Sequence, residues 1–206
     1  MMETYIMKKR IIWQDAILKK IKIVFFFFIF FTISNFSFAS ERWVVDKTLS
    51  TIEFELPILF AKNVKGTFNA IDGYVEIDTN TKKNNKAIFS VLIEDIEINY
   101  SKYKDLVLSD IFFDDKNFPK AVLDTKKFSY TDEDEIEIEV ELSIKGKNQM
   151  IPLTINIIQL AEEVVQIQSE LIFSRNSFNI GTGNWRNTTI LKDNVKLNTN
   201  IFLFKE

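Results

Sequence analysis

The sequence predicts an all-β fold, an antiparallel barrel or sandwich of eight to ten strands with one short helix. The strongest sign is residues 134–157, where apolar and polar residues alternate strictly on both sides of a glycine turn at residues 145–148. This alternation is typical of a long antiparallel hairpin with one buried and one wet face. Shorter runs with the same period of two recur along the chain. A long strand of this kind suits a curved sheet that closes on itself.

The other predicted strands share the hairpin's pattern, and we expect them at residues 43–46, 52–56, 64–68, 73–77, 86–98, 121–128, 165–173 and 195–203. Within residues 86–98 the apolar phase slips by one at Glu94 and Asp95, which predicts a β-bulge. Residues 101–113 instead show the three-to-four spacing of a helix. Ser101 is the expected N-cap of that helix.

Residues 1–39 have the pattern of a secretory signal peptide. A basic segment precedes the apolar residues 23–33, and Ser37 and Ala39 occupy the small-residue positions before a cleavage site. The apolar run is shorter than the roughly 20 residues that span a bilayer, which favours a cleaved leader over a membrane anchor. We therefore expect cleavage near Ala39, one domain over residues 40–206, and a periplasmic or secreted location.

The composition excludes several classes of function. The 206 residues contain no histidine and no cysteine, which rules out Ser-His-Asp and Cys-His nucleophiles, His-bound zinc and thiolate metal sites. Residues 40–206 carry 20 basic and 27 acidic side chains, and this net charge of −7 argues against binding to nucleic acid. The acidic and glycine-rich segments lack the spacing of a calcium loop or a phosphate loop. We expect no metal, no cofactor and no nucleic acid.

The aromatic content is the unusual feature of the composition. Eight of the 20 phenylalanines precede Ser40, and the others belong to the predicted barrel. The interior of an eight-stranded barrel can just be filled by side chains, or can hold one small ligand. Aromatic residues more often pack than line a pocket, and the residues alone leave a solid core and a ligand tunnel both open.

Six segments of the chain follow one another in a specific order: WVVD (43–46) with STIEF (50–54), VKGTF (64–68) ahead of Gly73, DLVLSDIFFD (105–114), FPKA (118–121), LSIKG (142–146) and RNSFNIG (175–181). Taken together and in this order, they resemble the YceI family of exported lipid-binding proteins. The resemblance covers residues 43–204. It implies a lipocalin-like antiparallel β-barrel of about eight strands that encloses a long polyisoprenoid chain.

Strand phase and helix position then select the candidate ligand contacts. The apolar candidates are Phe54, Phe68, Phe112, Phe113, Leu142, Phe173, Phe178 and Trp185. Lys104 and Arg175 are the basic candidates for contact with a polar head group. The family usually has an Arg-Asp pair, often after a His, at the head of the helix, whereas here Lys104 precedes Asp105. Lysine lacks the bidentate fork of arginine, and a structural ion pair is the alternative role for Lys104.

The resemblance implies non-enzymatic binding, storage or transport of a long-chain isoprenoid or similar amphiphilic lipid inside the barrel. Two alternatives stay open. One is an enzyme that acts on a bound lipid through a tyrosine, lysine or carboxylate. The other is a solid-core periplasmic module that interacts with a protein partner. The sequence also leaves a homodimer open and does not identify a protein partner.

Overall fold

The computed structural model describes residues 40–58, 63–131, 133 and 135–206. The predicted signal peptide, residues 1–39, lies outside the described residues. Within the described ranges, no helix is long and apolar enough to cross a membrane.

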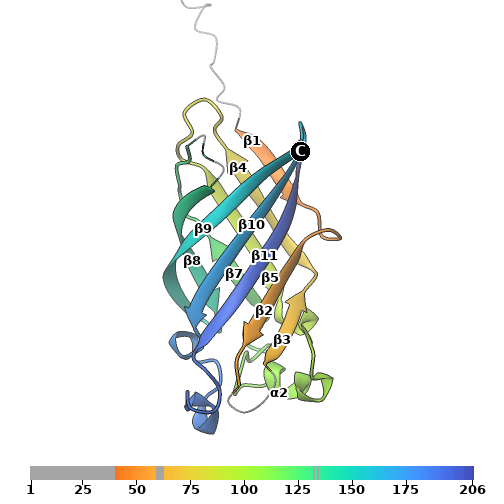
Figure 1. The fold of residues 1–206 in the computed structure, drawn as a ribbon, viewed down its shortest axis with the longest axis vertical. Coiled ribbons are helices and arrows are strands. Elements are labelled where there is room, and N and C mark those ends of the chain that lie inside the picture. The colour runs from red at the N-terminus through yellow and green to blue at the C-terminus, as the bar shows by residue number, and fades with distance from the viewer. Residues whose placement is uncertain (1–39, 59–62, 132, 134) are drawn as a thin grey trace, which may run out of the picture. The chain divides into compact units, whose positions relative to one another are not determined.

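Antiparallel strands make up most of the described chain (Figure 1). They are β1 (Glu41–Val45), β2 (Thr51–Leu56), β3 (Val64–Phe68), β4 (Ile71–Ile77), β5 (Lys86–Leu92), β6 (Glu97–Ile98), β7 (Lys120–Asp124), β8 (Glu135–Ile144), β9 (Lys147–Ala161), β10 (Val164–Ser174) and β11 (Asn194–Lys205). The α-helix among the described residues is α2 (Lys104–Leu108), and the 3-10 turns are η1 (Ile93–Asp95), η2 (Ser101–Tyr103), η3 (Arg175–Phe178) and η4 (Gly183–Arg186).

Eight strands form a closed ring in the order β1-β4-β5-β7-β8-β9-β10-β11, and the pairing of β1 with β11 completes it. The predicted antiparallel barrel of about eight strands is therefore confirmed. The strands cross the barrel at a steep tilt, as closure of a sheet requires (Figure 1). At the end of the barrel that carries α2, β2 also pairs with β11, and β3 and β6 extend the sheet from there.

Two strands share one edge of β11 because the chain makes a tight turn between them. β1 pairs with residues 203–205 of β11 and β2 pairs with residues 196–200. In the turn, Asp46 Oδ1 accepts hydrogen bonds from the Thr48 hydroxyl at 2.6 Å and from the Leu49 N–H at 3.0 Å. Phe202 N–H donates to the buried Ser50 hydroxyl at 2.9 Å, which replaces the ladder bond that is missing there.

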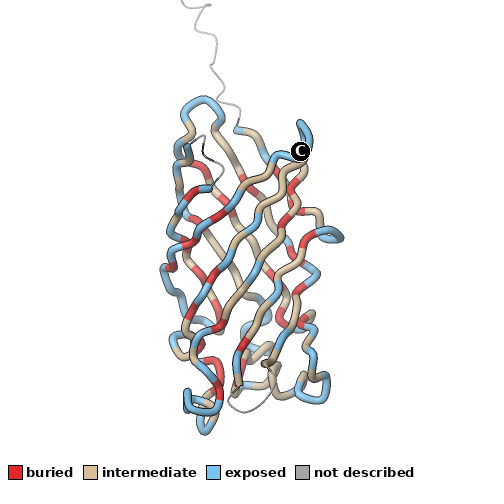
Figure 2. Tube along the Cα trace, in the orientation of Figure 1, coloured by how far each residue is buried: buried red, intermediate tan, exposed pale blue. Residues whose placement is uncertain are grey.

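The predicted hairpin is confirmed as β8 and β9. Ile144 is paired with Lys147, and the two residues between them, Lys145 and Gly146, both have positive φ, at 50° and 67°. Positive φ at both central positions is the requirement of a tight type I′ turn, whose twist matches that of the strands. Buried and exposed residues alternate along β8 and β9, as the period of two predicts (Figure 2).

The bulge predicted at Glu94 and Asp95 is wrong. The chain forms the 3-10 turn η1 there, which places Ile93 and Ile96 three residues apart and buries both of them. The Ser101 cap is also wrong, because Ser101 lies inside η2, and no side-chain hydrogen bond caps η2 or α2. The strand predicted for residues 121–128 ends at Asp124, and the next residue, Thr125, donates and accepts hydrogen bonds with the Ala87 backbone.

Two aspartates in turns predict how stability depends on acid. The Thr48 hydroxyl and then the Thr48 and Leu49 N–H groups hold the pKa of Asp46 below its ordinary value of 3.8. The Thr81 N–H and hydroxyl do the same for the pKa of Asp78. A carboxylate with a lowered folded-state pKa stabilises the fold above pH 3.8, and this contribution disappears as the pH falls through the lowered value.

We expect the Asp46→Asn/Asp78→Asn double variant to melt at a lower temperature than the wild type at pH 7. The two melting curves should converge as the pH falls from 4 to 2, because the wild type then loses the same two charges. Circular dichroism melts at each pH measure this difference. A difference in melting temperature that stays constant over that range would contradict the assignment.

Candidate functional site

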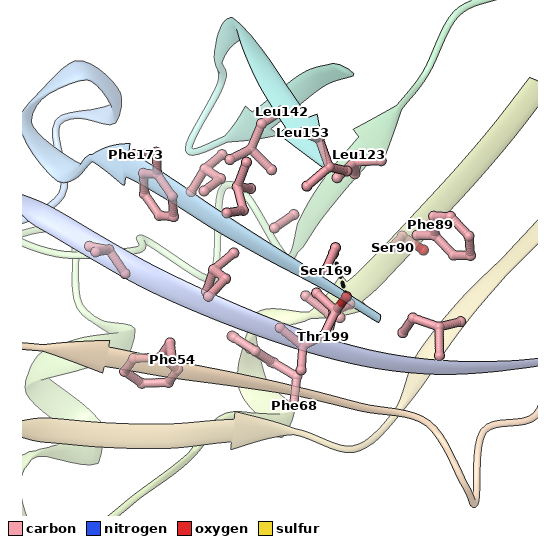
Figure 3. Close-up of a pocket in the computed structure, with 18 of the residues that line it drawn as sticks. Phe54, Phe68, Phe89, Ser90, Leu123, Leu142, Leu153, Ser169, Phe173 and Thr199 are labelled. Carbon is pink, nitrogen blue, oxygen red and sulfur yellow. Dashed lines mark hydrogen bonds between the residues drawn. The ribbon is translucent and has the colours of Figure 1, made fainter. Parts of the chain in front are cut away.

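The barrel encloses a cavity of about 820 Å³ (Figure 3). Ligand pockets in proteins generally span about 300–1,000 Å³, so the cavity is large enough to hold a ligand. Its lining includes exposed residues at both ends of the barrel, Thr79 and Gln159 at one end and Tyr103 and Ile190 at the other. The sequence alone is compatible with either a solid core or a ligand tunnel, and the structure contains a cavity.

The described residues that line the cavity carry charge only at its two ends. Glu41 lies at the β1 end and pairs with Lys205 at 2.8 Å. Lys102 lies at the α2 end, where its Nζ is 4.9 Å from the centre of the Tyr103 ring. Between these ends the lining is aliphatic and aromatic apart from a few hydroxyl-bearing residues. Because an unpaired charge is costly to bury, the middle of the cavity favours an uncharged occupant.

Two glycine–phenylalanine pairs keep the cavity open. Gly66 on β3 is opposite Phe54 on β2, and Gly73 on β4 is opposite Phe89 on β5. A Cβ at Gly66 would clash with the Glu97 carbonyl oxygen and the Phe54 ring. A Cβ at Gly73 would clash with the Ile88 carbonyl oxygen and lie 2.7 Å from Phe89 Cδ1. Each ring therefore covers the glycine opposite it and lies against the wall of the barrel. Aromatic residues commonly cover a glycine on a neighbouring strand in this way.

Most of the predicted apolar contacts do line the cavity. They are Phe54, Phe68, Phe112, Phe113, Leu142, Phe173 and Trp185. The rings of Phe54 and Phe68 are 6.2 Å apart, and those of Phe112 and Trp185 are 5.7 Å apart, so they form aromatic clusters on the wall. These residues come from β2, β3, β8, β10, η4 and the segment after α2, and the closed sheet brings them together.

Phe178 is not part of the lining. Its side chain is fully buried and packs perpendicular to the Phe173 ring, with the ring centres 5.3 Å apart. Phe178 belongs to η3, and it supports Phe173 from behind. The prediction that Phe178 contacts a ligand does not fit this position.

Arg175 is also outside the lining, and its side chain is fully buried. Its guanidinium donates to the backbone carbonyls of Lys192 at 2.8 Å, Ile180 at 2.9 Å and Leu191 at 2.7 Å. Burial lowers the pKa of Arg175, but an arginine stays protonated at neutral pH. The donors are used to hold residues 175–193 in place, so the prediction that Arg175 binds a head group does not fit the structure.

Lys104 begins α2 and does not line the cavity either. Among the described residues it forms no salt bridge within 4.0 Å, so the alternative role as an ion pair with Asp105 is not observed. The lysine that does reach the cavity is Lys102, on η2. Sequence phase could not select Lys102 because a short irregular turn has no fixed inward face.

Hydrogen bonds join the loops at the α2 end of the barrel. The Lys145 Nζ, in the β8–β9 turn, donates to the carbonyls of Asp110 at 2.6 Å and Asn179 at 3.0 Å. The N–H groups of Gly181 and Thr182 both donate to the Ile111 carbonyl, at 2.9 and 3.0 Å. The segment after α2, the hairpin turn and residues 175–193 are thus held together at this end.

Several residues that line the cavity were not among the predicted contacts, including Phe89, Ala121, Ser169 and Thr199. Ser169 and Thr199 occupy inward positions of the predicted strands 165–173 and 195–203, and their phase could have identified them. No three acidic side chains in the described part of the chain are close enough to hold a metal ion.

A closed antiparallel barrel around a largely apolar cavity defines a β-barrel of the lipocalin-like class. Within this class the chain belongs to the YceI family, because the model of the YceI-like domain matches residues 43–203. A comparison with curated proteins finds no match.

Solved structures with the same fold include BcnA of Burkholderia cenocepacia, with a TM-score of 0.70 and 22% identity over 77% of this chain and 98% of that one. A polyisoprenoid binding domain of Saccharophagus degradans gives a TM-score of 0.66 at 13% identity, over 80% and 98% of the two chains. The YCEI protein of Campylobacter jejuni gives 0.63 at 22%, over 73% and 89%. At these identities the similarity establishes the fold.

The first prediction from the site concerns Gly66. We expect Gly66→Ala to lower the free energy of unfolding by about 1–3 kcal/mol, because the new methyl would clash with both the Phe54 ring and the Glu97 carbonyl. Thr67→Ala, on the other face of the same strand, is the control and should change it by about 0.5 kcal/mol or less. Urea denaturation measures both values, and equal effects of the two variants would contradict this role for Gly66.

The second prediction distinguishes a structural Arg175 from a ligand contact. Arg175→Met leaves buried carbonyls without a donor and should lower the free energy of unfolding by about 3–5 kcal/mol. Arg186 is exposed in the same segment, and Arg186→Met should leave stability nearly unchanged. A stable Arg175→Met protein that fails to bind ligand would instead show that Arg175 contacts the ligand.

Proposed function

We propose that the protein binds one long-chain isoprenoid, or a similar amphiphilic lipid, inside the barrel and stores or carries it without chemical change. The observation that carries this proposal is the apolar cavity of about 820 Å³ that reaches both ends of the barrel. Membership of the YceI family supports it, as does the fold shared with a polyisoprenoid binding domain.

The energetics of such a ligand are dominated by its chain. Burial of a methylene from water contributes about 0.8 kcal/mol, so a chain of several isoprene units has a gross transfer term of tens of kcal/mol. Observed affinities do not exceed about 20 kcal/mol, and the difference is offset by ordering of the chain and by the loss of its membrane or micelle surroundings. A lumen whose middle carries no charge therefore suffices for tight binding.

The site favours binding of the lipid without catalysis. The carboxylate of the lining, Glu41, is paired with Lys205 at the end of the barrel, far from the middle of the cavity. The alternative, an enzyme acting on a bound lipid, predicts that a supplied lipid is converted with a pH-rate profile controlled by one buried group. Chromatography of lipid recovered after long incubation tests this alternative directly.

We also propose export to the periplasm or the medium, with cleavage of the leader near Ala39. The leader pattern in residues 1–39 supports this location. Expression of the full chain in a bacterium, fractionation, and N-terminal sequencing of the product test it. A product that keeps residues 1–39 in the membrane fraction would show an anchor.

The central test is to extract the purified protein with organic solvent and identify the recovered lipid by mass spectrometry. We expect one isoprenoid or similar lipid per chain. Removal of the lipid should lower the melting temperature, because a ligand at 100 times its Kd stabilises the folded state by about 2.7 kcal/mol. No recovered lipid, no uptake of added isoprenoid and an unchanged melting temperature would contradict the proposed function.

A blocking substitution gives a further prediction. Ala121 lines the cavity from β7, and Ala121→Trp would fill part of the lumen with an indole ring. We expect at least a tenfold loss of lipid affinity with little change in the melting temperature of the lipid-free protein. Thr154→Trp adds the same ring on the exposed face of β9 and should bind lipid normally. Equal affinities of the two variants in a fluorescence displacement assay would rule out binding in the lumen.

A further inference from the structure

We propose that Ser169 and Thr199 form a polar subsite halfway along the lumen and that the ligand carries an uncharged carbonyl oxygen there. This inference rests on the proposed function and specifies the chemical class of the lipid. It predicts a ketone, ester or amide within the barrel and not a plain hydrocarbon chain at that depth.

The two hydroxyls face the lumen side by side (Figure 3). Ser169 on β10 is paired in register with Thr199 on β11. The Ser169 Oγ and the Thr199 Oγ1 are 2.6 Å apart and share one hydrogen bond, in which either can be the donor. Both residues line the cavity.

The pair lies in the middle of the tunnel. Ser169 is five residues from Val164 and five from Ser174, the two ends of β10. At about 3.3 Å per residue, each end of the strand is roughly 16 Å away along its direction. An oxygen bound here would therefore be buried deep inside the barrel and not exposed at a mouth.

The surroundings of the pair are apolar. The next inward positions along the two strands and the register partners on both sides are all aliphatic, namely Ile167, Leu171, Leu197, Ile201, Ile155 and Ile52. Along β10 and β11, the pair of hydroxyls therefore offers hydrogen bonds at one depth, and the neighbouring inward positions on either side offer none.

The hydrogen bond between the two hydroxyls leaves some of their capacity unused. Two hydroxyls carry two protons and four lone pairs, and their mutual bond uses one proton and one lone pair. The described structure gives neither hydroxyl a further partner. One O–H donor therefore remains available for an acceptor in the lumen.

Two buried hydroxyls elsewhere in the barrel are used differently. The Thr125 hydroxyl accepts from Ala87 N–H at 2.8 Å, and the Ser50 hydroxyl accepts from Phe202 N–H at 2.9 Å. Those two hydroxyls complete the backbone ladder, so they have a structural role. Ser169 and Thr199 have no bond to the backbone among the described contacts, and the strands around them pair without their help.

The absence of charge in the middle of the lining favours a neutral hydrogen-bond acceptor on the ligand. The charged residues of the lining, Glu41 and Lys102, lie at the two ends, and the middle offers no cation to a carboxylate or phosphate. A single hydroxyl donor matches a carbonyl oxygen, which accepts a hydrogen bond and carries no charge. The geometry thus fits a neutral lipid whose carbonyl sits at the depth of Ser169 and Thr199.

The core of the test is a cycle of two probes on two forms of the full-length protein, the wild type and a double variant. The probes share one isoprenoid chain: geranylgeranylacetone, a methyl ketone, and the hydrocarbon in which its carbonyl is replaced by CH2. The Ser169→Ala/Thr199→Val variant removes both hydroxyls at nearly constant volume. Displacement of a fluorescent lipid gives the four Kd values. The cycle cancels the different solubilities of the probes in water, because each probe is compared with itself.

We expect the double variant to lose about fivefold to tenfold in affinity for the ketone and to bind the hydrocarbon as the wild type does. The exchange variant, Ser169→Thr/Thr199→Ser, keeps both hydroxyls and is the matched control, and it should bind both probes like the wild type. In infrared spectra, the carbonyl band of the bound ketone should lie at lower frequency in the wild type than in the double variant.

The outcomes separate this inference from the proposed function. Equal loss for both probes, or no loss for either, together with an unshifted carbonyl band, would overturn the subsite and show that the hydroxyls only pair with each other. Failure of the wild type to bind either probe would overturn the proposed function itself. Melting of the lipid-free variants establishes that all three proteins are folded.

Discussion

The hollow interior depends on the two cross-strand pairs of glycine and phenylalanine. An eight-stranded barrel is close to the size at which side chains fill it completely, so small changes of side-chain position decide between a core and a tunnel. Phe54 over Gly66 and Phe89 over Gly73 place two large rings on the wall. A side chain at either glycine would clash with the ring opposite it and with a neighbouring backbone carbonyl.

The α2 end of the barrel is held by two basic side chains that donate to backbone carbonyls. Arg175 fixes residues 175–193 through carbonyls of Ile180, Leu191 and Lys192, and Lys145 fixes the segment after α2. Carbonyls in irregular loops need donors because no strand or helix supplies them. A basic side chain that resembles a ligand contact in the sequence, Arg175, is thus used to build the wall, and the middle of the lumen is left without charge.

The strands could be predicted because their period of two is a local property of the chain. The lumen could not, because it depends on contacts such as that of Phe54 with Gly66, which only the register brings together. The role of Arg175 also escaped prediction, because its partners are carbonyls that carry no signal in the sequence. The phase of Ser169 and Thr199 pointed inward, whereas their pairing across 30 residues became visible only in the folded sheet.

Selectivity in a tunnel of this kind has to come from what the apolar wall does not provide. Burial of methylene groups contributes in proportion to area and favours every chain that fits, so it discriminates weakly between lipids of similar length. A polar atom of the lipid is different, because it loses its hydrogen bond to water on entering the barrel. The barrel must supply a new hydrogen bond at the depth where that atom comes to rest. With one pair of hydroxyls at mid-depth, the barrel would select a lipid by the distance between its oxygen and its chain end, and the wall would select it by width.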